Sequence, residues 1–165
     1  MAANDYHFVT VWRFAATTCE DVSDVLANAE DLPRWWPSVY LDVRVTHSGD
    51  AHGIGKRVAL LTKGWLPYTL RWTFVITENR RPHGFSLEAS GDFVGRGTWT
   101  IQPEGNAVRV AYDWKISAEK GLLKYLSWLV KPVFAWNHRW AMRMGAESLR
   151  LELRRRHAAQ STFRS

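Results

Sequence analysis

The side chains best suited to acid–base chemistry in this sequence are two tyrosines and one histidine. Tyr68 and Tyr112 fall on the predicted inward phase of two strands, and His138 flanks the predicted inward face of a C-terminal helix. A buried phenol can polarise an enolate oxygen, and an imidazole can take up a proton near neutral pH. The carboxylates of the strands fall on outward phases instead, at Asp42, Glu88 and Asp113. The three residues are therefore the catalytic candidates, but no catalytic motif is identifiable.

Other reactive side chains do not form a recognisable site. A glycine-containing turn carries three residues that could bind a metal, His47, Asp50 and His52. A loop fixes no ligand geometry, so we interpret them as surface residues. Cys19 begins a helix, where the helix dipole lowers the pKa of a thiol, but it has no obvious partner and is interpreted as structural. Gly95 and Gly97 lie within a strand, which argues against a phosphate-binding loop. We expect neither a metal nor a cofactor.

The composition describes one folded domain that is rich in aromatic rings. Of the 165 residues, 46% are hydrophobic and 23% are charged, which excludes a disordered chain. The single cysteine excludes a disulfide framework. Ten tryptophans bring the aromatic fraction to 13%, so any enclosed space would have wide, flat walls. The formal charge of +6 favours anionic partners but does not bear on the fold.

The sequence contains no recognisable targeting or membrane-spanning segment. Residues 1–7 lack the basic and then apolar pattern of a signal peptide. The most apolar stretch, 122–136, is too short to cross a bilayer and contains Lys124, Lys131 and Pro132. A cytoplasmic protein with a single domain over 1–157 and a flexible tail over 158–165 is expected. The sequence does not specify an oligomeric state, although Trp35, Trp36 and Trp128 are candidates for an exposed contact surface.

Hydrophobic and polar residues alternate through the middle of the chain. A strand is predicted over 6–14 and six more between residues 41 and 116, with short links that imply antiparallel neighbours. Alternation of this kind implies one buried and one solvent-facing side. The inward residues that we expect to line an enclosed space are Tyr68, Leu70, Trp72, Phe74, Phe85, Leu87, Trp99, Tyr112 and Trp114.

Helices are predicted after the first strand and in the final third of the chain. Thr17 and Glu20 have capping-box spacing, which predicts a helix to about residue 29. A short second helix is predicted to start at 30–33 and to end at 35–37. A long amphipathic helix is predicted from 133 to about 155. Its predicted inward face contains Val133, Phe134, Asn137, Trp140, Ala141, Met144, Gly145, Ser148 and Leu151. Its other face is basic, with Arg139, Arg143, Arg150, Arg154, Arg155 and Arg156, interrupted by Glu147 and Glu152.

Two features favour a cavity between the sheet and this helix. Rigid rings on a concave sheet pack imperfectly, and the middle of the inward helix face is small or polar. A glycine inside a helix costs about 1 kcal/mol relative to alanine, which space for a ligand or for a tryptophan ring would offset at Gly145. We expect the helix to contribute Asn137, Trp140, Ala141, Met144 and Gly145 to the ligand site. The alternative is that the aromatic stripe simply forms a solid core.

This order of elements resembles the START-like (SRPBCC) superfamily, which includes birch-pollen-allergen-like proteins and the polyketide cyclase/dehydrase-like family. The resemblance rests on the strand ending at Phe14, the helix over 20–29 and the stretch Glu30-Asp31-Leu32-Pro33-Arg34-Trp35-Trp36-Pro37. The segment Gly95-Arg96-Gly97-Thr98-Trp99 and the helix over 134–153 add to it. The resemblance implies an α+β helix-grip fold, in which a seven-stranded antiparallel sheet wraps around a long C-terminal helix and two short helices follow the first strand.

Members of this superfamily bind or transform bulky apolar molecules, and they share no universal catalytic motif. We therefore expect this chain to bind or carry a bulky hydrophobic small molecule, lipid-like or aromatic. One alternative is a cyclase, aromatase or dehydratase that uses the same cavity. A second is a peripheral membrane protein that uses the segment 122–136 and the basic helix face for transient contact. No nucleic-acid partner is expected.

Overall fold

One antiparallel sheet and one long helix account for most of the molecule. A computed structural model describes residues 5–119, 121 and 127–164. The seven strands lie in the order β1-β7-β6-β5-β4-β3-β2, and every neighbouring pair is antiparallel. Their bounds are β1 Asp5–Ala15, β2 Tyr40–His47, β3 Arg57–Lys63, β4 Thr69–Asn79, β5 Gly84–Gly91, β6 Phe93–Glu104 and β7 Ala107–Ala118.

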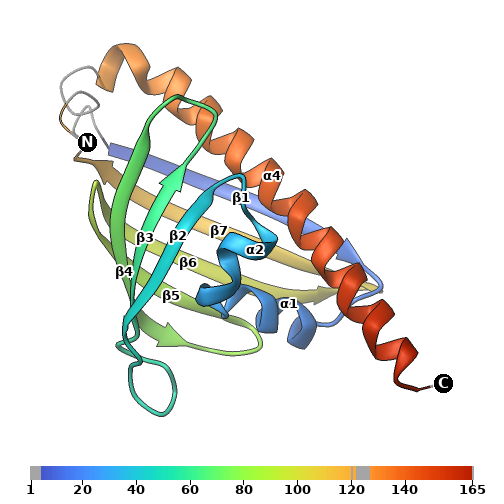
Figure 1. Cartoon of the computed structure of the whole chain (residues 1–165). Coiled ribbons are helices and arrows are strands. Elements are labelled where there is room, and N and C mark those ends of the chain that lie inside the picture. Colours follow the sequence, from blue (N-terminus) through green and yellow to red (C-terminus); the bar gives the residue numbers. More distant parts are fainter. Residues whose placement is uncertain (1–4, 120, 122–126, 165) are drawn as a thin grey trace.

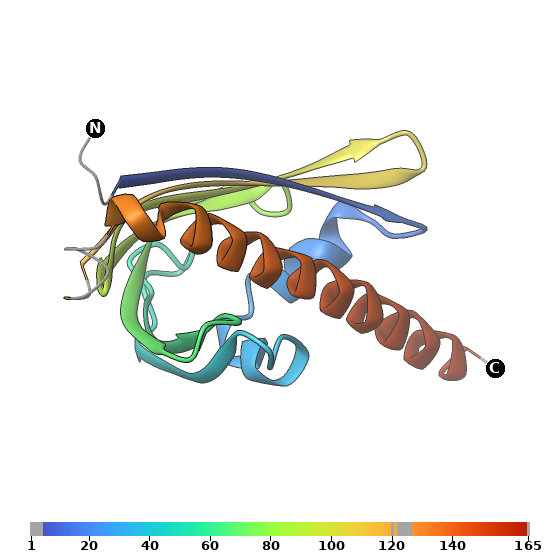
Figure 2. The same ribbon diagram turned by 90° about the horizontal axis from the view of Figure 1, so that it is seen from above.

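The helices lie on one side of the sheet. Three short ones follow β1, namely α1 (Cys19–Leu26), the 3-10 helix η1 (Ala29–Asp31) and α2 (Leu32–Trp35). The long helix α4 covers Ser127–Thr162 and runs along the sheet (Figure 1). Seen from above, the sheet curls so that β1 and β7 lie on one side of α4 and β2 and β3 on the other (Figure 2). The predicted helix-grip architecture is therefore confirmed.

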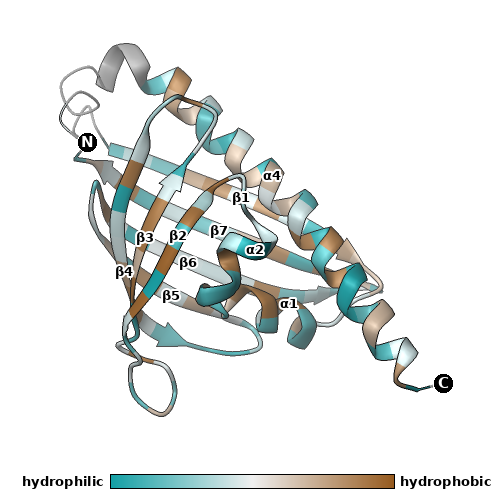
Figure 3. Ribbon diagram, in the orientation of Figure 1, coloured by the Kyte–Doolittle hydropathy of each residue, from teal (hydrophilic) through white to brown (hydrophobic). Residues whose placement is uncertain are grey.

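The alternating pattern of the strands fixes which face they bury. In β4, Leu70, Trp72 and Phe74 are buried, and the residues between them are more exposed. Bands of high and low hydropathy alternate in the same way along the strands (Figure 3). Successive side chains of a strand point to opposite faces, so every second residue faces α4 and the short helices. Asp42 and Glu88 are exposed, as predicted.

The start of α1 differs by one residue from the prediction. Thr18, not Thr17, caps the helix: its hydroxyl accepts from the Asp21 N–H, and the Asp21 carboxylate accepts from the Thr18 N–H. The capping box therefore uses Asp21 in place of Glu20. Aspartate performs the same role as glutamate here because its carboxylate also reaches back to the N-cap.

The predicted inward face of α4 is partly wrong. Val133 and Leu151 are 43% and 65% exposed, whereas Met142, Leu149 and Leu153 are buried. The contact line follows Phe134, Met142, Leu149 and Leu153 because the sheet meets the helix about one residue away from the centre of the predicted face. The helix also continues to Thr162, so residues 158–162 are helical although the sequence predicted a tail.

The structure describes only part of the region before residue 133. Residues 122–126 of the predicted apolar segment, and the side chain of Trp128, lie outside what the structure describes. Pro132 lies inside α4, which continues through it. No helix among the described residues is long and apolar enough to span a membrane.

Candidate functional site

A cavity of about 500 Å³ opens between the sheet and the short helices. Its sheet wall is formed by apolar and aromatic residues of β4 to β7, and its other walls by α1, η1, α2 and the loops β2–β3 and β4–β5. The lining residues from the sheet are Tyr40 of β2 and, from β4 to β7, Trp72, Phe74, Ile76, Phe85, Leu87, Trp99 and Tyr112. The helices, the loops and the last residue of β4 add Leu26, Ala27, Ala29, Leu32, Trp36, Ser48, Ala51, His52, Gly53, Lys56, Arg81 and Asn79.

A second, smaller cavity of about 90 Å³ lies nearer the N-terminal half of α4. Its walls include Leu70, Trp114, Phe134, Asn137 and His138. Four residues line both spaces: Trp36, Tyr40, Trp72 and Tyr112. An aromatic partition therefore separates a large chamber from a small one.

The residues expected at a ligand site divide into three groups. The large cavity is lined by Trp72, Phe74, Phe85, Leu87, Trp99 and Tyr112. The small cavity is lined by Leu70, Trp114, Asn137 and Ala141, together with the shared Trp72 and Tyr112. Four expected residues line neither space, and these are Tyr68, Trp140, Met144 and Gly145.

Gly145 makes room for a tryptophan and not for a ligand. A Cβ atom at this position would lie 2.3 Å from Cζ2 of Trp36. Trp36 and its neighbour Trp35 are 3% and 5% exposed, so the suggestion that they mark an exposed contact surface is wrong. Trp36 packs instead against Trp12, Trp35 and Tyr40.

The sequence reasoning missed the helical side of the large cavity. Leu26, Leu32, Trp36 and Tyr40 line it, although none was predicted to do so. The signal was the Leu32-Pro33-Arg34-Trp35-Trp36-Pro37 stretch, whose large apolar side chains follow a turn of helix and must be buried. The predicted site considered only the sheet and the C-terminal helix.

The phenols of Tyr40 and Tyr112 both belong to the aromatic partition. Burial raises the pKa of Tyr112 well above its usual value, and the neighbouring Tyr40 raises it further. Burial also raises the pKa of Tyr40. Both phenols are therefore protonated hydrogen-bond donors at physiological pH. The ring of Tyr112 stacks between Trp99 and Trp114, at centroid distances of 4.1 and 5.5 Å, which fixes its position.

His138 and Tyr68 lie apart from the large cavity. The His138 ring stacks on Phe8 at 4.1 Å, and Nε2 is buried with no hydrogen-bond partner among the described residues. Burial, with a smaller effect from Arg139, lowers the pKa of His138 to about 4. The imidazole is therefore neutral at pH 7. Burial, assisted by Tyr6, raises the pKa of Tyr68 to about 12.

Asn137 and Trp72 use their polar atoms within the protein. Oδ1 of Asn137 accepts from the backbone N–H groups of Trp65 and Leu66, at 2.7 and 3.2 Å. Nε1 of Trp72 donates to the Thr62 hydroxyl at 3.0 Å. The hydrogen bonds fix the β3–β4 loop and the Trp72 ring, so these groups are not the first choice for orienting a ligand.

The mouth of the large cavity carries two cations that are already paired. Lys56 Nζ lies 3.1 Å from a Glu30 carboxylate oxygen. The Arg81 guanidinium donates to Ser23 Oγ at 3.1 Å and also to the Asp24 carboxylate. No carboxylate of the described residues lines the cavity itself. The interior is therefore apolar and the rim is close to electrically balanced.

The remaining reactive residues serve local structure. Asp50 accepts from the N–H groups of His52 and Ile54, at 2.8 and 3.0 Å, and His47 Nδ1 accepts from Gly49 N–H. Across the described part of the chain, no three metal-ligating side chains are grouped. Burial, and next the Glu20 charge, raise the pKa of the Cys19 thiol.

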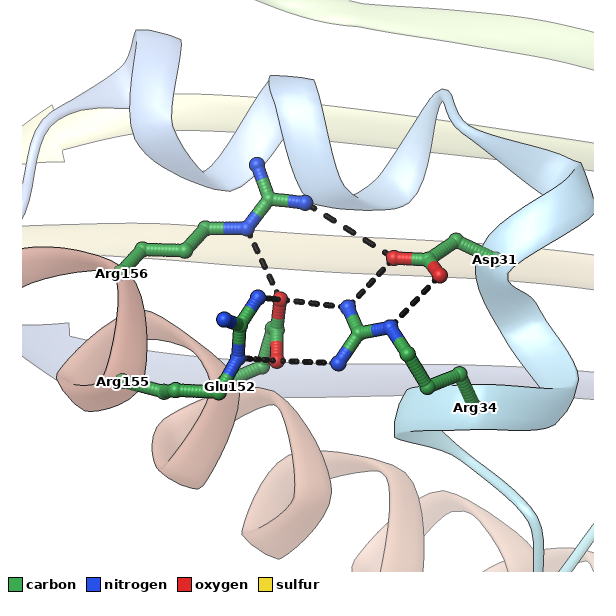
Figure 4. Close-up of polar contacts among 5 residues, drawn as sticks. All are labelled: Asp31, Arg34, Glu152, Arg155 and Arg156. Atoms are coloured by element: carbon green, nitrogen blue, oxygen red, sulfur yellow. Dashed lines mark hydrogen bonds and ion pairs between the residues drawn. The ribbon is translucent and has the colours of Figure 1, made fainter. Parts of the chain in front are cut away.

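A charged cluster, which the sequence analysis did not predict, joins α2 to α4 beside the site (Figure 4). Glu152 is 4% exposed and accepts from Arg34, Arg155 and Arg156 at 2.7 to 3.0 Å. Arg34 also donates from Nε to Asp31 at 2.7 Å. Hydrogen bonds from Arg155 and Arg34, with Arg156 next, hold the pKa of Glu152 well below its usual range. The cluster fixes the short helices that carry Leu32 and Trp36.

The architecture is similar to those of several solved proteins. The Zhui aromatase/cyclase of a Streptomyces strain matches with a TM-score of 0.69 and 13% identity, over 92% of this chain and 95% of that one. A START superfamily protein of Mycobacterium smegmatis gives 0.64 and 11%, over 90% and 97%. A Thermus thermophilus protein gives 0.63 and 17%, over 88% and 96%. At such identities the matches show the fold alone.

Sequence comparison gives a family but no individual relative. No curated protein matches the chain. The family model described as polyketide cyclase / dehydrase and lipid transport matches residues 7–154, which is nearly the whole domain. This chain therefore belongs to the polyketide cyclase/dehydrase and lipid transport family.

Proposed function

We propose that the protein binds a bulky, ring-containing apolar small molecule in the large cavity. The observation that carries the proposal is the lining of the roughly 500 Å³ space, which is aromatic and aliphatic apart from Tyr40, Tyr112 and the rim. Ligand sites for small molecules typically have about 300–1,000 Å³ and a few convergent polar groups. The two phenols supply such groups, and they favour a ligand that carries a carbonyl or another hydrogen-bond acceptor.

The expected affinity is moderate. Burying about 300 Å² of ligand apolar surface gives a gross gain of about 7 kcal/mol. Ordering of the ligand and of cavity side chains reduces this gain. A rigid polycyclic ligand loses less freedom than a flexible chain, so micromolar binding of rigid molecules is expected and flexible chains should bind more weakly.

A pair of substitutions on one strand tests the proposal. Leu87→Trp fills the cavity from β5, whereas Glu88→Trp places the same side chain on the solvent face of that strand. Binding is measured by quenching of tryptophan fluorescence with a hydroxyanthraquinone and by displacement of anilinonaphthalene sulfonate. Leu87→Trp should weaken binding about tenfold or more and Glu88→Trp should leave it within about twofold. Equal affinities in the two variants, or no binding by the wild-type protein, would overturn the proposal.

A cyclase, aromatase or dehydratase is the second candidate function. The family description and the structural match to an aromatase/cyclase support it. Tyr40 and Tyr112 are protonated donors that could polarise a bound carbonyl, as such a reaction requires. Against it, the lining contains no carboxylate, and His52 is the only histidine among the described residues of that lining.

The two candidates are separated by turnover. If the protein is an enzyme, Tyr112→Phe should lower the rate on a poly-β-ketone substrate about tenfold or more and change affinity only a few-fold. Tyr68→Phe is the matched control, because Tyr68 lines neither cavity. Binding of the probes without turnover by the wild-type protein would leave the carrier function and exclude cyclisation of that substrate.

A further inference from the structure

Three large apolar side chains are exposed together beside the N-terminal half of α4. Trp65, in the β3–β4 loop, is 61% exposed, and Trp136 and Val133 of α4 are 41% and 43% exposed. The rings of Trp65 and Trp136 meet edge to face at 4.8 Å. We call these three residues the tryptophan patch. It lies outside both cavities.

Hydrogen bonds to α4 fix the backbone of the loop that carries Trp65. Oδ1 of Asn137 accepts from both Trp65 N–H and Leu66 N–H. Gly64 lets the loop approach, since a Cβ there would lie 2.3 Å from the Asn137 amide. Figure 1 shows the β3–β4 loop beside the first part of α4. A buried amide thus fixes an exposed indole against a second exposed indole.

A basic stripe continues from the patch along the exposed side of α4. Trp136 is followed at intervals of three or four residues by Arg139, Arg143, Glu147, Arg150 and Arg154, which are all exposed. Among the described residues, no carboxylate forms an ion pair with Arg139, Arg143 or Arg154. By contrast, Arg155 and Arg156 are engaged by Glu152. Free cations therefore lie one and two turns beyond the tryptophans on the same face.

We propose that the tryptophan patch and the adjacent arginines dock the protein on an anionic lipid surface. Indole rings favour the boundary between acyl chains and headgroups, because one part of the ring is apolar and its N–H needs a polar partner. Cations beside them gain from anionic headgroups, and the +6 net charge adds long-range attraction. Nucleic acid would use the arginines but would not need the paired, fixed tryptophans. The inference goes beyond the ligand binding proposed above and does not depend on it.

Co-sedimentation with vesicles tests this docking surface. The probes are vesicles of phosphatidylcholine with about 30 mol % phosphatidylserine, and of phosphatidylcholine alone. The wild-type protein should bind the anionic vesicles, and binding should fall steeply as salt rises from about 0.05 to about 0.5 M. Trp65→Ser with Trp136→Ser should lower the partition coefficient about tenfold or more. Phe163→Ser is the control, because Phe163 is an exposed ring (92%) beyond the far end of α4.

The charge contribution is tested on the same helix face. Arg139→Gln with Arg143→Gln should weaken binding more than Arg150→Gln with Arg154→Gln, because the second pair lies about three turns further from Trp136. Circular dichroism of each variant checks the fold. No vesicle binding by the wild-type protein at low salt, or equal binding by the tryptophan double variant, would overturn the proposal. So would a concentration-dependent dimer that the tryptophan double variant abolishes without any vesicle binding, since the patch would then join two copies.

Discussion

Gly145 is the residue at which α4 admits the ring of Trp36. Because a Cβ would lie 2.3 Å from that ring, Gly145→Ala should push Trp36 toward the cavity. Alanine favours a helix by about 1 kcal/mol, but overpacking against the buried Trp36 ring should cost about 2–3 kcal/mol, the upper part of the usual range, so we expect net destabilisation of about 1–2 kcal/mol. Urea unfolding measures it, with Glu147→Ala, an exposed site on the same helix, as the control. A Gly145→Ala protein as stable as the control would show that the Trp36 ring moves without a cost in stability.

His138 makes stability depend on pH below neutrality. Its pKa in the folded protein is about 4, below the ordinary 6.5, because burial disfavours the imidazolium. Between these values the unfolded chain binds the extra proton, so stability is present above about pH 6.5 and is lost as pH falls toward 4. His138→Phe should keep the stacking on Phe8 and remove about 1–2 kcal/mol of this loss. Urea unfolding across that range is the measurement, and an unchanged slope in the variant would contradict the assignment.

The contact between α2 and α4 depends on the Glu152 cluster. Glu152→Gln removes the charge that Arg34, Arg155 and Arg156 face, and it leaves three cations close together. We expect the free energy of unfolding to fall by about 1.5–3 kcal/mol. Glu147→Gln, exposed on the same helix, should change it by less than about 0.5 kcal/mol. If both variants lose the same amount, the cluster does not hold the helices together.

The same cluster gives acid sensitivity in a lower pH range than His138. The pKa of Glu152 in the folded protein is below its usual 4.5, so the carboxylate stabilises the fold above about pH 4.5. That stability is lost as pH falls through the lowered pKa. Glu152→Gln should therefore lose less stability than the wild-type protein between about pH 4.5 and 2, as measured by thermal unfolding. A steeper loss in the variant would contradict this sign.

At the scale of elements, the sequence predicted the strands better than the helices that border the site. Alternation in β4 and β7 identified Trp72, Phe74, Tyr112 and Trp114 as inward residues because a strand has only two faces. Which side of α4 is buried depends on where the sheet contacts the helix. Leu149 is buried and Leu151 is exposed for this reason. The Glu152 cluster joins residues 118 positions apart, Arg34 and Glu152, so no local pattern could reveal it.

At the scale of the whole molecule, the cavity depends on three parts of the fold: the sheet, the short helices and α4. The curled sheet forms one wall, α1 to α2 form another, and α4 holds both through Leu149, Leu153 and Glu152. None of these contacts involves the last turns of α4, which are exposed from residue 158 onward where the structure describes them. The helix therefore has a part that stabilises the site and a part that projects from it.

Truncation distinguishes these two parts of α4. Ending the chain at His157 retains the contact of its Nε2 with Asp21 at 3.3 Å, and the described residues that it removes, 158–164, are all exposed. The melting temperature should change by less than about 2 °C and the affinity for a hydroxyanthraquinone should be unchanged. Ending the chain at Leu151 also removes Glu152 and Leu153, which should abolish cooperative unfolding or lower the melting temperature by more than about 10 °C. If the shorter removal were equally damaging, residues 158–162 would have to stabilise the domain through contacts that their exposure argues against.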